Sequence, residues 1–155
     1  MTTRRALVAA AVGLLMLALF LHVRGARQPA VVADPLRTPG VLNAAVTPAT
    51  MRGTICRRGW TRTVRPPTDY TNALKRKQMR MYDEHGPPSA YQEDHLISLE
   101  LGGDPTDPRN LWPEPYPRAS AVDRIENDLN AQVCSGALSL AEAQLKEAQL
   151  KHTQG

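Results

Sequence analysis

Apolar residues follow three patterns along the chain, and each pattern predicts a different kind of segment. The first is an apolar run over residues 6–23, which lies behind two arginines and contains His22 as its only polar side chain. Its 18 residues lie between the lengths typical of a secretory signal and of a membrane-spanning helix. We therefore expect residues 1–24 to be either a signal peptide or an uncleaved membrane anchor. The protein is accordingly predicted to be exported, and to be either secreted or periplasmic, or held at a membrane by this helix.

The second pattern covers residues 25–50, where no helical or strand period is sustained. Four prolines stand in this stretch among Ala, Val and Thr residues. Such a composition is typical of a linker. One small domain, predicted over residues 51–151, remains.

The third pattern is a set of short periodic segments within that domain. Residues 70–85 lack Pro and Gly and predict a helix, while residues 91–101 alternate and predict a strand closed by a glycine turn. Residues 110–112 predict a short return strand that ends at the prolines following it. Residues 120–133 and 139–151 predict two helices, each beginning with a capping box. The apolar stripe of the first of these helices consists of Val122, Ile125, Leu129 and Val133. The fold class is predicted to be α+β.

The last of these helices contains the repeat EAQLK–EAQLK at residues 142–151. A period of five residues matches no stripe on an α-helix. We therefore expect this tail to extend into solvent, and we assign it no chemistry.

The chain has two cysteines, Cys56 and Cys134. An even pair in an exported protein predicts a disulfide, because disulfides persist outside the cytosol, although two free thiols are the alternative. No Cys-x-x-Cys or Cys/His cluster is present, which excludes a zinc ribbon or finger.

The net charge is +4, and the charged residues are distributed unevenly along the chain. Residues 51–82 carry nine basic residues and one acidic residue, whereas residues 83–155 carry five basic and 13 acidic residues. A basic half predicts a surface for a polyanion, with a solvated basic surface as the alternative. The candidate nucleic-acid contacts are Arg57, Arg58, Arg62, Lys75 and Arg76.

The acidic half contains residue types suited to phosphodiester hydrolysis. Asp94 could bind a metal ion and the adjacent His95 could act as general base, since the ordinary pKa of histidine lies near neutrality. Asn110 could hold the intervening loop and orient the histidine. Further metal ligands could come from the helix that follows, on Asp123, Glu126 or Asn127.

These residues stand in a recognisable order. Asp94-His95, then LISLELGGDPTDPRNLW and a helix after a proline-rich break, resemble the HNH group of the ββα-metal nucleases. Residues 53–145 also resemble small exported bacterial proteins of HNH-like type. The resemblance implies a ββα-metal core with flanking helices, a catalytic His95 and a bracing Asn110. It implies a divalent metal ion between hairpin and helix.

The chain departs from this pattern in one respect, because no histidine occurs between His95 and His152. The metal site would then consist of oxygen ligands, which suit Mg²⁺ or Mn²⁺ better than zinc. The function predicted is a metal-dependent nuclease, monomeric and of little sequence preference, that acts on DNA or RNA.

Each candidate residue also has a purely structural interpretation. His95 could be a hydrogen-bonded strand residue, Asp94 could pair with Arg109, and Asp123 could only cap its helix. Trp60 could lie in the core or stack on a base. The alternative functions are a catalytically silent polyanion-binding domain and an interaction domain of the cell envelope.

Overall fold

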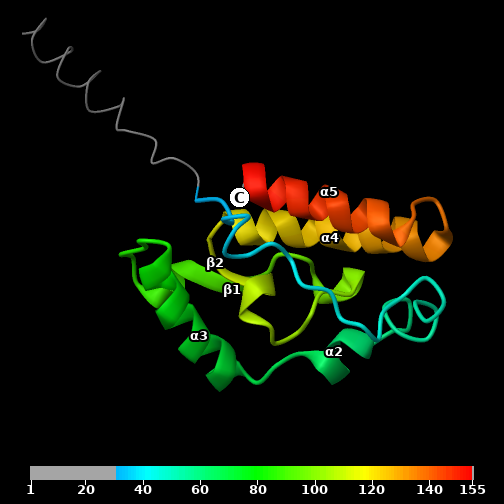
Figure 1. Ribbon diagram of the computed structural model, residues 1–155, viewed down its shortest axis with the longest axis horizontal. Coiled ribbons are helices and arrows are strands. Elements are labelled where there is room, and N and C mark those ends of the chain that lie inside the picture. The colour runs from blue at the N-terminus through cyan, green and yellow to red at the C-terminus, as the bar shows by residue number, and fades with distance from the viewer. Residues whose placement is uncertain (1–30, 155) are drawn as a thin grey trace, which may run out of the picture. The chain divides into compact units, whose positions relative to one another are not determined.

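The computed structural model describes residues 31–154, shown in colour in Figure 1. They belong to one compact unit that begins at Val31. The apolar segment 1–24, predicted to be a signal or anchor, lies outside the described residues, as does the start of the expected linker. No helix within residues 31–154 combines the length and the apolarity needed to cross a membrane.

The architecture is α+β, with a two-stranded antiparallel sheet among the helices. Strand β1 (Tyr91–His95) pairs with β2 (Leu111–Pro115) in a register that sets Tyr91 opposite Pro115 and His95 opposite Leu111. The prediction of a strand over 91–101 is therefore right only for its first half. The chain leaves the sheet after His95, and residues 99–101 form a 3₁₀ turn, η2 (Leu99–Leu101).

The return strand is longer than expected and runs through Pro113 instead of ending there. A proline cannot donate a ladder hydrogen bond, but in a two-stranded sheet each strand has one open edge where a missing N–H costs nothing. The prolines therefore fix the extended conformation of β2 without breaking its pairing.

Helices cover both sides of this hairpin (Figure 1). α3 (Thr68–Met81) contacts β1 and β2 on one side, and α4 (Arg118–Ser135) and α5 (Leu140–Thr153) run side by side on the other. The short α2 (Trp60–Val64) precedes α3. α3 ends four residues before its predicted limit, just ahead of Asp83, whose φ of 58° is left-handed.

The buried stripe of α4 differs from the predicted one at a single position. Val122, Leu129 and Val133 are buried as expected, but Ile125 is 38% exposed and Glu126 faces the interior. The capping box predicted at Ser120 is also wrong, because the helix begins at Arg118 and its N-cap has no side-chain hydrogen bond.

α5 contradicts the expectation of a solvated tail. Its capping box at Ser139 and Glu142 is present as predicted, but the helix then packs along α4. Its buried residues are Leu140, Ala143, Glu147 and Lys151. These residues are spaced three to four positions apart, so they form one stripe on the helix. Two of them are charged, and a search for apolar residues therefore does not find the stripe.

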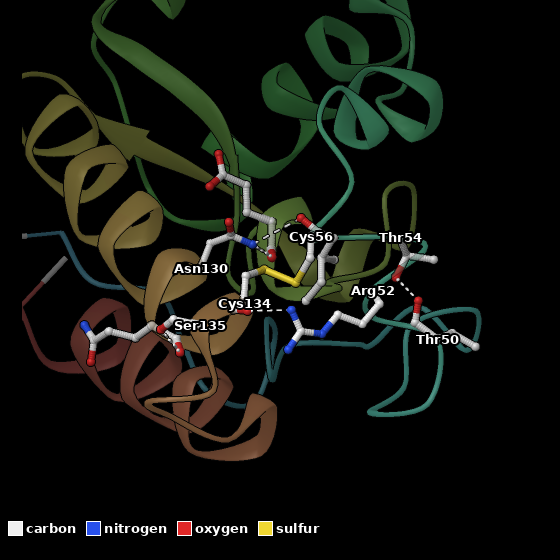
Figure 2. The surroundings of a disulfide bond; sticks show 10 residues. Thr50, Arg52, Thr54, Cys56, Asn130, Cys134 and Ser135 are labelled. Atoms are coloured by element: carbon white, nitrogen blue, oxygen red, sulfur yellow. Dashed lines mark hydrogen bonds between the residues drawn. A yellow bond between two sulfur atoms is a disulfide. The ribbon is translucent and has the colours of Figure 1, made fainter.

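The disulfide between Cys56 and Cys134 is present, with a Cα–Cα distance of 5.5 Å. Figure 2 shows that further contacts join the same two segments: Arg52 Nη1 donates to the carbonyl of Cys134 at 2.9 Å. Asn130 Nδ2 donates to the carbonyl oxygens of Ile55 and Glu100 at 3.3 and 2.7 Å. The end of α4 is thus held against the start of the predicted domain.

Residues 31–50, expected to be part of a linker, belong to this compact unit and contact its other residues. The N–H of Ala33 donates to the carbonyl of Lys151 at 3.0 Å, and Leu42 forms an isolated bridge with Gly103. Buried Ala33, Leu96 and Trp112 make a small second cluster beside the main core.

Candidate functional site

Asp94 and His95 end strand β1, and as consecutive strand residues they face opposite sides of the hairpin. Asp94 points toward α4 and α5, where it meets Lys151. His95 points the other way, and its Nε2 lies 3.1 Å from the carbonyl oxygen of Pro105 in the loop between the strands. Both side chains are buried.

Asn110 closes that loop from the start of β2, as the sequence predicted. Its Oδ1 accepts from the N–H of Ile97 at 2.9 Å, and its Nδ2 donates to the carbonyl oxygens of Ile97 and Asp104 at 3.0 and 2.9 Å. Gly103 lies against the same group, where a Cβ would come within 1.8 Å of the Ile97 oxygen. Only glycine permits this approach.

The centre of the space between β1, α4 and α5 holds the ammonium group of Lys151. Its Nζ lies 2.6 Å from Oδ2 of Asp94, 2.6 Å from Oε1 of Glu126 and 2.5 Å from the carbonyl oxygen of His95. Oε1 of Glu147 follows at 3.4 Å. Lys151 is fully buried. An ammonium so enclosed is stable only when it is paired.

Two further carboxyls complete this cluster, which we call the Lys151 cluster: Asp94, Glu114, Glu126, Glu147 and Lys151. Both oxygens of Glu147 accept from the N–H of Ser98 at 3.0 Å. No donor among residues 31–154 reaches either oxygen of the fully buried Glu114, which lies beside Asp94.

The pKa values within the Lys151 cluster reflect one cation shared among four acids. Burial alone would lower the pKa of Lys151, but the attraction of Asp94 and its other carboxyl neighbours raises it well above its usual value. Burial would raise the pKa of Asp94, yet the ammonium lowers it. Burial and the Asp94 charge raise the pKa of Glu114 to about 8, and burial also raises the pKa values of Glu126 and Glu147. Asp94 is therefore the acid of the cluster whose pKa is lowered, and Glu114, protonated below pH 8 or so, can donate a hydrogen bond to it.

The four predicted metal ligands do not assemble around a common point. Asp94 and Glu126 do converge, but on the ammonium of Lys151. Asp123 and Asn127 lie on the exposed side of α4, where Asn127 Nδ2 donates to the carbonyl of Asp123 at 2.6 Å. No group of three or more His, Cys, Asp or Glu residues suited to a metal ion occurs in the described part of the chain. Mg²⁺ or Mn²⁺ does not fit between Asp94 and Glu126 while Lys151 stands there, since two cations cannot share that space.

The surroundings of His95 set its protonation. Burial lowers the pKa of His95, and Asp94 and the Pro105 carbonyl oppose that shift only in part. Because a carbonyl only accepts, Nε2 carries the hydrogen in the neutral ring and Nδ1 is the basic nitrogen. The imidazole is neutral, as a general base must be, but only 5% of the residue is exposed.

Glu93 lies on the same face of β1 as His95, next to α3. Burial raises the pKa of Glu93 to about 8, against the pull of Lys75. Lys75 itself donates to the carbonyl of Tyr91 at 2.9 Å and is half-buried. Its ammonium is therefore engaged within the fold, unlike the exposed Arg76 on the same helix.

Two of the other predicted nucleic-acid contacts, Arg57 and Arg58, line a hollow of about 360 Å³ beside the disulfide. Arg57, Arg58 and Trp60 line one side, and Asn127 and Asn130 of α4 line the other. Arg57 and Arg58 are exposed, as is Arg62 on α2. Glu100 also lines the hollow, and its burial raises the pKa of its carboxyl.

Several partners differ from those considered from the sequence. Arg109 pairs with Asp107 at 2.6 Å instead of Asp94, and Glu126 pairs with Lys151. Lys151 and Glu147 were missed, although their i, i+4 spacing on a predicted helix is a signal for an ion pair. Glu114 stands between two prolines and carries no such signal.

Comparison with family models, with curated proteins and with solved structures found no match.

Proposed function

We propose that this domain binds single-stranded nucleic acid at the hollow between Arg57, Arg58 and α4, and that it does so without metal-dependent cleavage. The order β1, loop, β2, α4, with Asn110 bracing the loop, supports an HNH-like origin for this core. We infer the absence of cleavage from the position of Lys151, whose Nζ lies 2.6 Å from Oδ2 of Asp94 and 2.6 Å from Oε1 of Glu126.

The hollow has the two features that unpaired nucleic acid requires. Exposed arginines supply positive charge for phosphates, and Trp60 supplies an aromatic surface on which a base can stack. The amide oxygens of Asn127 and Asn130 opposite can accept from base edges without imposing one sequence. Because Trp60 lies in a hollow beside the arginines, where its ring can stack on a base, we favour nucleic acid over an anionic membrane as the ligand.

The protein is proposed to work outside the cytosol, either released or tethered to a membrane through its N-terminal segment. The apolar segment 1–24 and the disulfide support this location. We propose that it acts as a monomer.

Binding is tested with the full, oxidised chain by fluorescence anisotropy of labelled oligo-dT and oligo-U over a range of salt concentrations. Arg57→Ala/Arg58→Ala should lower the salt slope by about 1.4, because each phosphate contact on a single strand contributes about 0.7. The matched control is Lys77→Ala/Arg80→Ala, which removes the same charge from the exposed surface of α3. Equal losses in the two double variants would contradict a site at the hollow.

Two further arms separate the alternatives. Anionic vesicles that bind as tightly as the oligonucleotides, with the same loss in the Arg57/Arg58 variant, would point to a membrane ligand. Plasmid and RNA are also incubated with Mg²⁺, Mn²⁺ or EDTA, and we expect no cleavage. Metal-dependent cleavage that disappears in His95→Ala would overturn the proposal and establish a nuclease. A chain that neither binds nor cuts would leave an interaction domain of the cell envelope.

A further inference from the structure

The Lys151 cluster places more acidic groups around one cation than an ion pair needs. Three carboxyls contact a single ammonium and a fourth, Glu114, lies beside Asp94; each is at most 8% exposed. The four belong to β1, β2, α4 and α5, so the cation sits where these elements meet. Acidic side-chain and carbonyl oxygens that converge on one point are also the ligands that a divalent ion uses.

The oxygens nearest the ammonium are its charge-assisted hydrogen-bond partners, and their distances from it also fall within the range of Ca²⁺ ligands. Asp94 Oδ2, Glu126 Oε1 and the His95 carbonyl lie at 2.5–2.6 Å from Nζ. Oxygen ligands of Ca²⁺ lie at about 2.3–2.6 Å, whereas those of Mg²⁺ lie at about 2.0–2.1 Å. With the lysine side chain removed, these oxygens would be available as ligands for a Ca²⁺ ion in its place.

We infer that Lys151 is a built-in cation, which takes the place of a divalent ion between β1, α4 and α5 and links these elements as a bound metal ion would. The last turn of α5 is held at the start of the described chain, which keeps the ammonium in place. The N–H of Ala33 donates to the Lys151 carbonyl at 3.0 Å, and His152 Nε2 lies 2.9 Å from the Thr38 carbonyl oxygen. This role does not depend on nucleic-acid binding at the hollow, which lies at other residues and is measured separately.

The test is whether a metal ion can replace the ammonium. Thermal unfolding of the full, oxidised chain is followed by circular dichroism in EDTA, Ca²⁺ and Mn²⁺. The Tm of the wild type should not respond to these ions. Lys151→Ala should have a lower Tm in EDTA and a saturable rise in Tm with Ca²⁺, and Tb³⁺ bound in its place should luminesce through Trp112, which is paired with Asp94 in the hairpin.

Two matched variants identify the position. Lys151→Met fills the space without charge, so it should lose stability and gain none from Ca²⁺. Lys151→Ala/Glu126→Gln lacks one ligand and should lose the saturable response. Lys151→Ser, which leaves space for the ion, replaces Lys151→Ala if the latter does not fold.

Three outcomes would overturn the inference. The first is a folded Lys151→Ala or Lys151→Ser variant whose Tm ignores Ca²⁺ and Mn²⁺. The second is failure of both variants to fold at saturating concentrations of either ion. The third is a wild type that is itself stabilised by Ca²⁺ through Glu126, because the ammonium would then not occupy the position.

Discussion

Replacement of Asn110 by alanine tests how the loop between the strands is held. The side chain is fully buried and makes three hydrogen bonds with the backbone of Ile97 and Asp104. Truncation leaves one N–H and two carbonyl groups without these partners. A buried polar group that loses its partner costs about 1–3 kcal/mol, so three such groups cost at least about 3 kcal/mol.

That cost is large compared with the total stability of a small domain, which is about 5–15 kcal/mol. We therefore expect Asn110→Ala to lose at least about 3 kcal/mol of unfolding free energy. The measurement is urea unfolding at neutral pH, followed by the fluorescence of buried Trp112 close to the altered residue. If the variant is unfolded without urea, the loss exceeds the unfolding free energy measured for the wild type.

The control is Asn127→Ala, which removes an amide from an exposed position on α4 where it bonds only the preceding turn. Its stability should change by no more than about 0.5 kcal/mol. A loss below about 1 kcal/mol in Asn110→Ala, similar to that in the control, would refute the reasoning that this side chain holds the loop by buried hydrogen bonds.

Three further predictions concern the disulfide, Glu93 and Gly103. Cys56→Ser/Cys134→Ser opens a loop of 78 residues and should lower the unfolding free energy by about 4 kcal/mol, measured by urea unfolding; an unchanged midpoint would contradict this. The pKa of Glu93 is about 8 in the folded chain, above its ordinary value of 4.5. The folded state therefore binds the extra proton between these pH values, and stability falls as pH rises through them, by at most about 1.4 kcal/mol per pH unit. Glu93→Gln should remove this part of the pH dependence in unfolding curves from pH 5 to pH 8, and parallel curves for wild type and variant would contradict it. Gly103→Ala would place a Cβ 1.8 Å from the Ile97 oxygen and should cost more than the usual 1–3 kcal/mol or so of overpacking; a thermal-unfolding curve like that of the wild type would refute it.

The elements that could be predicted are those whose buried faces are apolar or whose signals are local. The helix at 120–133 follows from its apolar stripe, the capping box at Ser139 from its spacing, and the disulfide from the presence of two cysteines. The bracing role of Asn110 follows from its resemblance to a known arrangement. Each of these depends on residues close in sequence or on a single pair.

The site could be predicted only in part, because its central group comes from a distant helix. The sequence predicts Asp94 and Glu126 as metal ligands, but both contact the ammonium of Lys151, which lies 57 residues beyond Asp94. A lysine in a repeat of Glu, Gln and Lys normally predicts a solvated surface. Only the tertiary contact of α5 with β1 and α4 shows that Glu147 and Lys151 are interior residues.

Burial of the Lys151 cluster also changes how the formal charge of the chain is divided between its surface and its interior. The acidic half of the sequence would be expected to offset the basic half and weaken its attraction for a polyanion. However, the cluster removes four carboxyls and one ammonium from the surface, so the rest of the chain carries a formal charge of +7 instead of +4. Three of these carboxyls also have raised pKa values, which lowers their share of the negative charge. The same residues that leave no room for a divalent ion thus make the exterior more basic. Burial of an ammonium in place of a metal ion therefore favours the binding of phosphates at the surface. The proposed role of Lys151 and the proposed nucleic-acid binding at the hollow thus support each other, although they rest on different residues.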